Sequence, residues 1–185
     1  EPDLLVVGKP IGGGVPAAAY GLSAAVAAAV EASFATHSID VSGIGGTLAG
    51  NALSVAAMRA ALSTTLRPED FAVAIPLAER FTAGVAAVIA ERRLPWHVQR
   101  LGCRAEYWFG PPPRHGAAAA AAGDVELEAF LHLYALNRGV LLTPFHNMAL
   151  LTPYHSPADV DLHTEVFAGA LAELFGGSTP GPTIP

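Results

Sequence analysis

The sequence predicts an α/β protein in two parts: the end of an α/β domain over residues 1–66 and a compact α+β domain over residues 67–176. A flexible tail is expected over residues 177–185, because it is rich in glycine and proline. Short apolar runs alternate with longer segments of helical periodicity, which indicates mixed strands and helices. The chain is 52% hydrophobic and 14% charged, so it can form a core and is too apolar for disorder.

The first part begins with a continuous apolar run, Leu4–Val7, which predicts a short buried strand of the parallel type. Gly8–Gly14 predicts a loop, because three consecutive glycines do not hold a regular element. Ala17–Leu22 predicts a second short strand and Ser23–Phe34 a helix of small residues. After a glycine-rich stretch, Asn51–Thr64 has the spacing of a helix with one apolar face. A strand at the very start of the chain suggests that the sequence begins inside a larger fold.

The second part predicts elements in the order helix, strand, helix, strands, helix. They are a helix start at Arg67–Asp70 with a long amphipathic helix over Ile75–Arg92, a half-buried strand over His97–Phe109, a loop over Gly110–Gly123, a helix over Glu126–Asn137, a strand over Val140–Leu142, a short extended piece from Leu150, and a helix from Ser156 to about Phe175. Within the predicted strand His97–Phe109, alternation places Cys103, Ala105 and Tyr107 on the buried face and Arg104 and Glu106 on the other.

Charge and composition exclude several classes of partner. The net charge is −6 and no basic stripe is present, so nucleic acid is not an expected partner. The longest apolar run, Pro16–Val30, is too short and too rich in alanine to span a bilayer, and no positively charged segment precedes it as in a signal peptide. Cys103 is the single cysteine and cannot form an internal disulfide, which fits a reducing, cytoplasmic compartment.

Lys9 is the one lysine among ten basic residues, and it stands between an apolar strand and three glycines. An amine in a partly desolvated pocket loses its proton more easily, and a neutral amine attacks an aldehyde to form an imine. Nearby glycines let the backbone approach a flat ligand closely. On these grounds alone an ordinary loop lysine is the favoured interpretation. A phosphate-binding P-loop is disfavoured, because the glycines follow the lysine and no Ser or Thr comes directly after it.

Two motifs resemble the class III pyridoxal-phosphate-dependent aminotransferases, in particular the glutamate-1-semialdehyde aminomutase-like branch. The first runs from Pro2-Asp3-Leu4 through Gly8-Lys9 and Ile11-Gly12-Gly13-Gly14 to Ala19-Tyr20-Gly21. The second is Gly46-Thr47-Leu48-Ala49-Gly50-Asn51, in which Ala49 replaces the serine of that branch. Gly139-Val140 and Thr143-Pro144 also resemble a strand of the family's C-terminal domain. The resemblance covers nearly the whole chain.

The resemblance implies the aspartate-aminotransferase-like fold (fold type I), with the end of the large cofactor-binding domain followed by the small C-terminal domain. It implies that Lys9 forms a Schiff base with pyridoxal 5'-phosphate and then moves a proton on the substrate. Gly46 and Thr47 would bind the cofactor phosphate from the other subunit of a homodimer, with the active site at the interface. The family's ring-binding groups lie upstream of this lysine, so the chain alone is expected to be only part of the active enzyme.

Two residues of the second part are candidates for binding substrate. Arg104 offers a two-pronged fit to a carboxylate, although an ion pair with Glu106 on the same predicted face is an open alternative. His146 follows Thr143-Pro144, where the family often lines the substrate entrance. His146 and the other histidines show no metal-binding spacing, so no metal is expected. Cys103 is expected to pack in the core.

The expected function is transfer of an amino group between an amine or amino acid and a keto acid or aldehyde. Two alternatives stay open: a glutamate-1-semialdehyde 2,1-aminomutase-type isomerase and a catalytically silent relative. The segment Gly102–Tyr107 departs from the strand associated with the aminomutase, which favours the transaminase.

Overall fold

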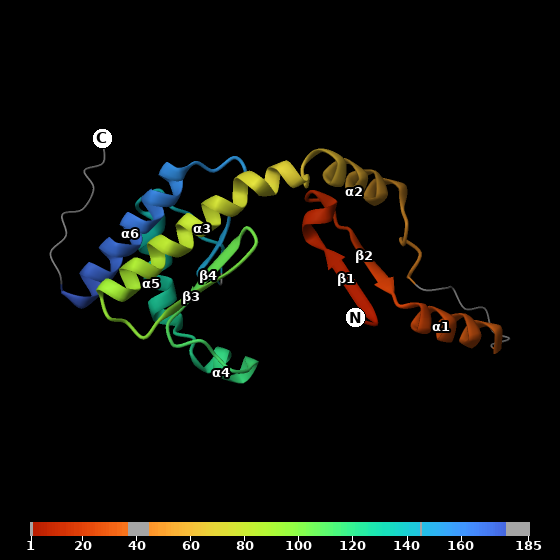
Figure 1. The fold of residues 1–185 in the computed structure, drawn as a ribbon, viewed down its shortest axis with the longest axis horizontal. Coiled ribbons are helices and arrows are strands. Elements are labelled where there is room, and N and C mark those ends of the chain that lie inside the picture. The colour runs from red at the N-terminus through yellow and green to blue at the C-terminus, as the bar shows by residue number, and fades with distance from the viewer. Residues whose placement is uncertain (1, 37–44, 145, 177–185) are drawn as a thin grey trace. The chain divides into compact units, whose positions relative to one another are not determined.

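The structure, a computed structural model, describes residues 2–36, 45–144 and 146–176. It divides into two compact units, Glu1–Arg67 (unit 1) and Pro68–Pro185 (unit 2). Figure 1 draws unit 1 in red to gold and unit 2 in yellow to blue. The predicted tail, residues 177–185, lies outside the described residues, as do residues 42–44 of the predicted glycine-rich stretch. Each unit is considered by itself below.

Unit 1 is built on an antiparallel hairpin. Strand β1 (Leu4–Gly8) pairs with β2 (Ala18–Leu22), and the register places Leu4 opposite Leu22 and Gly8 opposite Ala18. The 3-10 turn η1 (Lys9–Gly12) follows β1 directly, and helix α1 (Ala24–Thr36) follows β2. The prediction of a buried strand of the parallel type is wrong for unit 1, since β1 pairs antiparallel and its apolar side chains are exposed.

Helix α2 (Ala52–Thr64) packs on the loop that carries Lys9. Asn51 caps the helix through its Oδ1, which accepts a hydrogen bond of 2.9 Å from the backbone N–H of Ser54. The Ser54 hydroxyl in turn donates to the carbonyl oxygen of Pro16 at 2.9 Å. The Asn51 cap therefore joins the start of α2 to the segment between η1 and β2.

Unit 2 combines helices with a three-stranded antiparallel sheet of order β3-β4-β5. Its elements are α3 (Pro68–Glu91), β3 (His97–Leu101), β4 (Arg104–Trp108), α4 (Gly116–Ala121), α5 (Val125–Leu136), β5 (Met148–Leu150) and α6 (Pro157–Phe175). Figure 1 shows α3 and α6 running side by side. The largest fully buried side chains, which mark the centre of the core, are Tyr107, Phe81, Leu171 and Val85.

Helix α3 is long and apolar because one side of it forms this core. By length and composition alone it is the helix among the described residues that has the properties of a membrane span. The core helix of a soluble protein passes the same test. In unit 2 the buried residues of α3, including Phe81 and Val85, pack in the cluster that also holds Tyr107 of the sheet and Leu171 of α6.

Three predicted elements of unit 2 are wrong in detail. The single strand predicted over His97–Phe109 is a hairpin, because Gly102 adopts a φ of 57° and reverses the chain. Cys103, which follows in the turn, is only half-buried and does not belong to the core. Val140–Leu142 forms no strand, and the third strand lies later, at β5. The loop predicted over Gly110–Gly123 contains the short helix α4.

Candidate functional site

Lys9 lies at the junction between β1 and η1 in a backbone conformation that residues with a side chain rarely adopt. Its φ is 53°, and among the described residues only Arg93 shares a positive φ without being glycine. The left-handed conformation costs about 1–2 kcal/mol for an L-residue. Such strain is concentrated at functional sites, where surrounding structure holds the residue in place. Gly8 before it and Pro10 after it, at the start of the turn, fix the path of the chain.

The loop after Lys9 is tight at one point and open at another. A Cβ atom at Gly12 would lie 2.9 Å from the Cβ of Ala17, so only glycine fits there. Lys9 itself lines an open hollow of about 480 Å³ together with Pro10, Gly14 and the segment 15–17. The Lys9 side chain is exposed, so unit 1 alone does not supply the desolvated pocket that the sequence predicts.

Thr47 lies in a turn that is stabilised by backbone hydrogen bonds. The N–H of Ala49 donates to the carbonyl of Gly46 at 3.0 Å, and the N–H of Asn51 donates to that of Leu48 at 3.2 Å. Thr47 is exposed, as is the rest of the turn from residue 46 to residue 50. Residues 48–51 and 15–18 line one hollow of about 390 Å³ with part of α2. Both motifs therefore meet in unit 1 around the segment that follows Lys9, without a direct bond between Lys9 and Thr47 among the described interactions.

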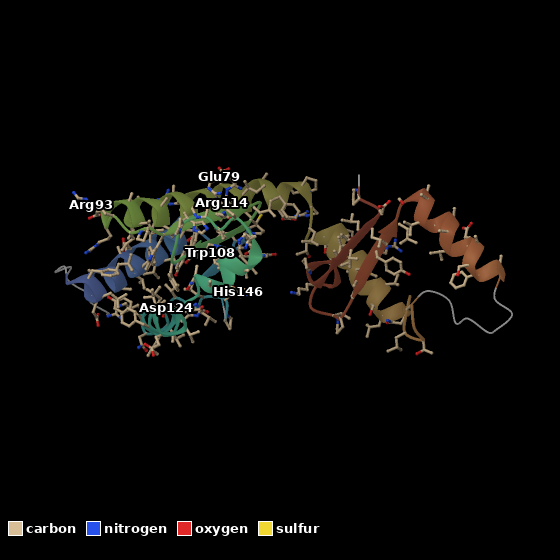
Figure 2. All side chains as sticks on the ribbon, turned by 90° about the horizontal axis from the view of Figure 1, so that it is seen from below. Glu79, Arg93, Trp108, Arg114, Asp124 and His146 are labelled. Carbon is tan, nitrogen blue, oxygen red and sulfur yellow. The ribbon has the colours of Figure 1, made fainter. Side chains whose placement is uncertain are left out.

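The two substrate-binding candidates of unit 2 are joined by Glu106. Arg104 Nη2 donates to Glu106 Oε2 at 2.6 Å, and His146 Nδ1 lies 3.1 Å from Glu106 Oε1. A carboxylate only accepts hydrogen bonds, so the His146 ring nitrogen is the donor. The Glu106 side chain is 10% exposed, whereas those of Arg104 and His146 are about half exposed. Figure 2 labels His146, and Trp108 at the end of β4.

The sheet brings these three groups together. Arg104 and Glu106 lie two residues apart on β4 and therefore on the same face, and the register places Glu106 opposite Met148, the first residue of β5. The backbone N–H of Tyr107 also donates to the carbonyl of Asn147 at 3.1 Å, which fixes the start of β5 against β4. His146 comes two residues before Met148. The structure thus contains the ion pair that the sequence left as an alternative for Arg104.

Sequence reasoning missed the central position of Glu106. Its place on the polar face of β4 predicts an exposed carboxylate, whereas Glu106 is buried and contacts His146, which is forty residues away in the chain. Phe145, between Pro144 and His146, lies outside the described residues. Among the described residues no group of three or more His, Cys, Asp or Glu side chains is placed to bind a metal.

A cavity in unit 2 is lined by a histidine, His163, that the sequence did not single out. His163 is buried, and burial lowers its pKa to about 4. Its Nδ1 has no hydrogen-bond partner among the described residues. It lines a cavity of about 330 Å³ with mostly apolar neighbours such as Phe81, Leu142 and Met148. Its neutral ring, 4.4 Å from that of Phe81 between ring centres, behaves as part of the core.

Comparison with known proteins identifies the family. No protein-family model matches the chain. A glutamate-1-semialdehyde 2,1-aminomutase of Thermomicrobium roseum is 33% identical over 177 residues, which are 95% of this chain and 40% of the relative. A glutamate-1-semialdehyde aminomutase from Pseudomonas aeruginosa PAO1, crystallised with PMP, matches with a TM-score of 0.88 and 47% identity over 94% of this chain and 40% of that chain.

An omega-transaminase from Sphaerobacter thermophilus has a TM-score of 0.70 and 27% identity over 95% of this chain and 39% of its own. The chain matches the C-terminal part of class III pyridoxal-phosphate-dependent aminotransferases. The fold of this family, fold type I, is therefore confirmed. The chain spans about 40% of the length of the curated relatives that it matches.

Proposed function

We propose that the complete polypeptide containing this sequence is a pyridoxal-phosphate-dependent aminotransferase in which Lys9 carries the cofactor. The observation that carries the proposal is the position of Lys9. It is the one lysine of the chain, and it is held at a φ of 53° between β1 and a glycine-rich turn. A strained, accessible amine at an open hollow fits attachment of an aldehyde.

Bound pyridoxal phosphate supplies an electron sink that stabilises negative charge on the substrate carbon next to the amino nitrogen. The chain would contribute the amine of Lys9, which would hold the cofactor between turnovers and, once released, would act as the base and then the acid of the 1,3-proton shift that moves a proton from this carbon to the cofactor. The exposed position of Lys9 in unit 1 leaves its amine accessible for both roles. Parts of the polypeptide outside unit 1 would exclude water from the Lys9 amine.

We assign phosphate binding to the turn at Gly46 and Thr47. A threonine hydroxyl and backbone N–H groups of a glycine-rich turn bind a phosphate oxygen without needing a positive charge. Thr47 is exposed, and glycines lie at residues 46 and 50 of its turn, so no bulky side chain at either of these positions blocks the approach of an anion. The proposal includes a homodimer in which this turn serves the cofactor of the partner subunit.

The substrates proposed are a small-molecule amino donor and a keto acid or aldehyde acceptor, with Arg104 binding a substrate carboxylate. A glutamate-1-semialdehyde aminomutase is the second candidate, because relatives with that name are 33% and 47% identical to this chain over the aligned residues. The segment Gly102–Tyr107, with its arginine and glutamate, departs from the strand that we expect of the aminomutase, and on this ground we propose the transaminase first.

Net transfer of an amino group to pyruvate or 2-oxoglutarate separates the two reactions. The transaminase requires a separate keto acid or aldehyde acceptor, and turnover of glutamate-1-semialdehyde without any added acceptor would favour the aminomutase instead. Lys9→Ala is the matched control for both, since each reaction uses the same lysine. A polypeptide that binds the cofactor but converts neither type of substrate would indicate a catalytically silent relative.

A further inference from the structure

The turn to which we assign phosphate binding depends on contacts outside itself. Residues 46–50 are exposed, and a glycine with a positive φ stands at each end, Gly45 at 126° and Gly50 at 67°. The hydrogen bond from the N–H of Ala49 to the carbonyl of Gly46 closes the turn but does not fix its position in unit 1. A binding site requires its groups to be held near their productive positions by the surrounding structure.

Asn51 fixes the turn to the start of α2. Its Nδ2 donates to the carbonyl of Leu48 at 2.9 Å and to the Oγ of Ser54 at 3.1 Å, while its Oδ1 accepts from the N–H of Ser54 at 2.9 Å. A backbone N–H only donates and a carbonyl only accepts, so these partners determine which atom of the amide is the oxygen. One side chain therefore holds the turn and the first turn of the helix together.

Ser54 extends this chain of hydrogen bonds to the segment that follows the Lys9 loop. Its hydroxyl accepts from Asn51 Nδ2 and donates to the carbonyl of Pro16 at 2.9 Å, although Pro16 stands 38 residues earlier in the sequence. Asn51 and Ser54 are both half-buried, and hydrogen bonds in such a chain strengthen one another. Figure 1 shows α2 beside the loop that joins β1 to β2. The chain thus runs from Leu48 of the turn to Pro16 of that loop.

We propose that Asn51 and Ser54 are positioning residues for the cofactor, which hold the phosphate-binding turn in a fixed place relative to the segment that follows Lys9. Their action is on the turn, with no contact of their own to the cofactor. A turn that is already ordered binds phosphate without the entropy cost of ordering it. This inference rests on the proposed function, because it takes the turn to bind the phosphate of the cofactor in the partner subunit.

Ser54→Ala tests the proposal because it removes the hydroxyl and keeps the backbone N–H that Asn51 caps. For the cofactor-free complete polypeptide, the dissociation constant of pyridoxal phosphate should rise roughly threefold to tenfold, as expected for one lost hydrogen bond. Pyridoxal has the same aldehyde but no phosphate, so its dissociation constant should stay at the wild-type value. Titration followed by the visible absorbance of the bound compound measures both constants. Ser54→Thr keeps a hydroxyl and should retain the wild-type affinity for both.

Ser63→Ala is the matched control. It is the same substitution in the same helix, and the Ser63 hydroxyl donates to the carbonyl of Ala60 within α2. Both dissociation constants should stay at their wild-type values. A purely structural role for Ser54 predicts that Ser54→Ala weakens both compounds in parallel or neither of them. Either of these results would overturn the proposal.

Asn51→Ser tests the other member of the chain and carries the test if Ser54→Ala does not fold. Serine supplies an oxygen to cap α2, but it lacks the amide that donates to Leu48 and Ser54. Pyridoxal phosphate should again bind more weakly, and pyridoxal should bind as in wild type. A wild-type ratio of the two dissociation constants in this variant would contradict the role of Asn51.

Two further measurements separate this inference from the proposed function. Thr47→Ala should weaken pyridoxal phosphate and spare pyridoxal, and borohydride reduction should leave the cofactor on Lys9. If both results are obtained and the ratio stays at the wild-type value in Ser54→Ala and Asn51→Ser, the inference is overturned and the proposed function stands. If Thr47→Ala changes neither constant, or no cofactor is found on Lys9, the proposed function fails and the inference fails with it.

Discussion

Acidification from pH 7 to pH 5 should destabilise unit 2 through His163, and His163→Phe should remove most of that loss. His163 is buried against Phe81, and burial lowers its pKa to about 4 from an ordinary value of 6.5. The unfolded chain therefore binds the proton more tightly than the folded chain. The stabilising contribution of the neutral ring is fully present above pH 6.5 and is lost as the pH falls toward 4.

The magnitude follows from the two pKa values. A difference of 6.5 − 4, about 2.5, at about 1.36 kcal/mol per pKa unit gives about 3 kcal/mol for the whole transition. At pH 5 the unfolded imidazole is almost fully protonated and the folded one is still neutral. The free energy of unfolding should therefore already be lower by about 2 kcal/mol. The ion-paired or capping carboxylates Asp159 and Asp161 have pKa values below 3.8, so they do not titrate in this window.

Urea unfolding followed by tryptophan fluorescence measures this loss. Both tryptophans of the chain, Trp96 and Trp108, lie in unit 2, and the Trp96 ring is 4.9 Å from Phe109 between ring centres. The free energy of unfolding is determined at pH 7 and pH 5 for wild type and for His163→Phe, whose ring takes the same place beside Phe81 and Phe167. Equal losses in the two proteins would refute the assignment of His163 as a buried neutral histidine, because their remaining titratable groups are the same.

Three further perturbations test the fold and the lysine loop. Gly84→Ala should destabilise the packing of α3 on α6 by about 1–3 kcal/mol, because its Cβ would lie 2.5 Å from Thr164 Oγ1. Chemical denaturation measures this loss, and adding Thr164→Ala to the Gly84→Ala variant should restore part of it. Ser156→Ala should cost about 1 kcal/mol in the same assay, because Ser156 and Asp159 form a capping box at the start of α6 and alanine removes the side-chain acceptor; an unchanged unfolding midpoint would contradict this role. Lys9→Gly should be more stable than Lys9→Ala by about 1 kcal/mol or less, since glycine accepts a φ of 53° without strain; a less stable glycine variant would argue against the strained backbone.

Helices of unit 2 could be predicted from the sequence because each carries its own boundary signals. Ser156 and Pro157 mark the start of α6, and both cap and first turn are found there. The apolar spacing of Phe81, Val85 and Ile89 likewise identifies the buried side of α3. These signals are local, so no knowledge of the rest of the fold is needed to interpret them.

The sheet of unit 2 was harder to predict because pairing depends on distant residues. A run of alternating residues from His97 to Phe109 is compatible with one long strand or with a hairpin, and the φ of Gly102 decides between them. The alternation also places Glu106 on the same face as Arg104, which is correct, but it does not predict the contact of Glu106 with His146. A residue that packs against a partner forty positions away leaves no periodic pattern in the sequence.

The lysine loop shows a similar division. The lone lysine, the glycines and the second motif are visible in the sequence and predict the family. The φ of Lys9 and the joining of the Asn51 cap to Pro16 through Ser54 are properties of the folded chain. Local chemistry alone favoured an ordinary loop residue at Lys9, the second motif at Gly46-Thr47 raised it to a cofactor anchor, and that role stays a prediction.

Reduction of the holoprotein with borohydride, followed by peptide mass spectrometry, shows which residue carries the cofactor. A Schiff base becomes a stable secondary amine on reduction, so the cofactor stays on the residue that carried it. The complete polypeptide should retain the added mass of pyridoxal phosphate on Lys9, and the Lys9→Ala variant should retain none. An adduct on a different lysine, or a visible absorbance band of bound cofactor that persists in Lys9→Ala, would contradict it.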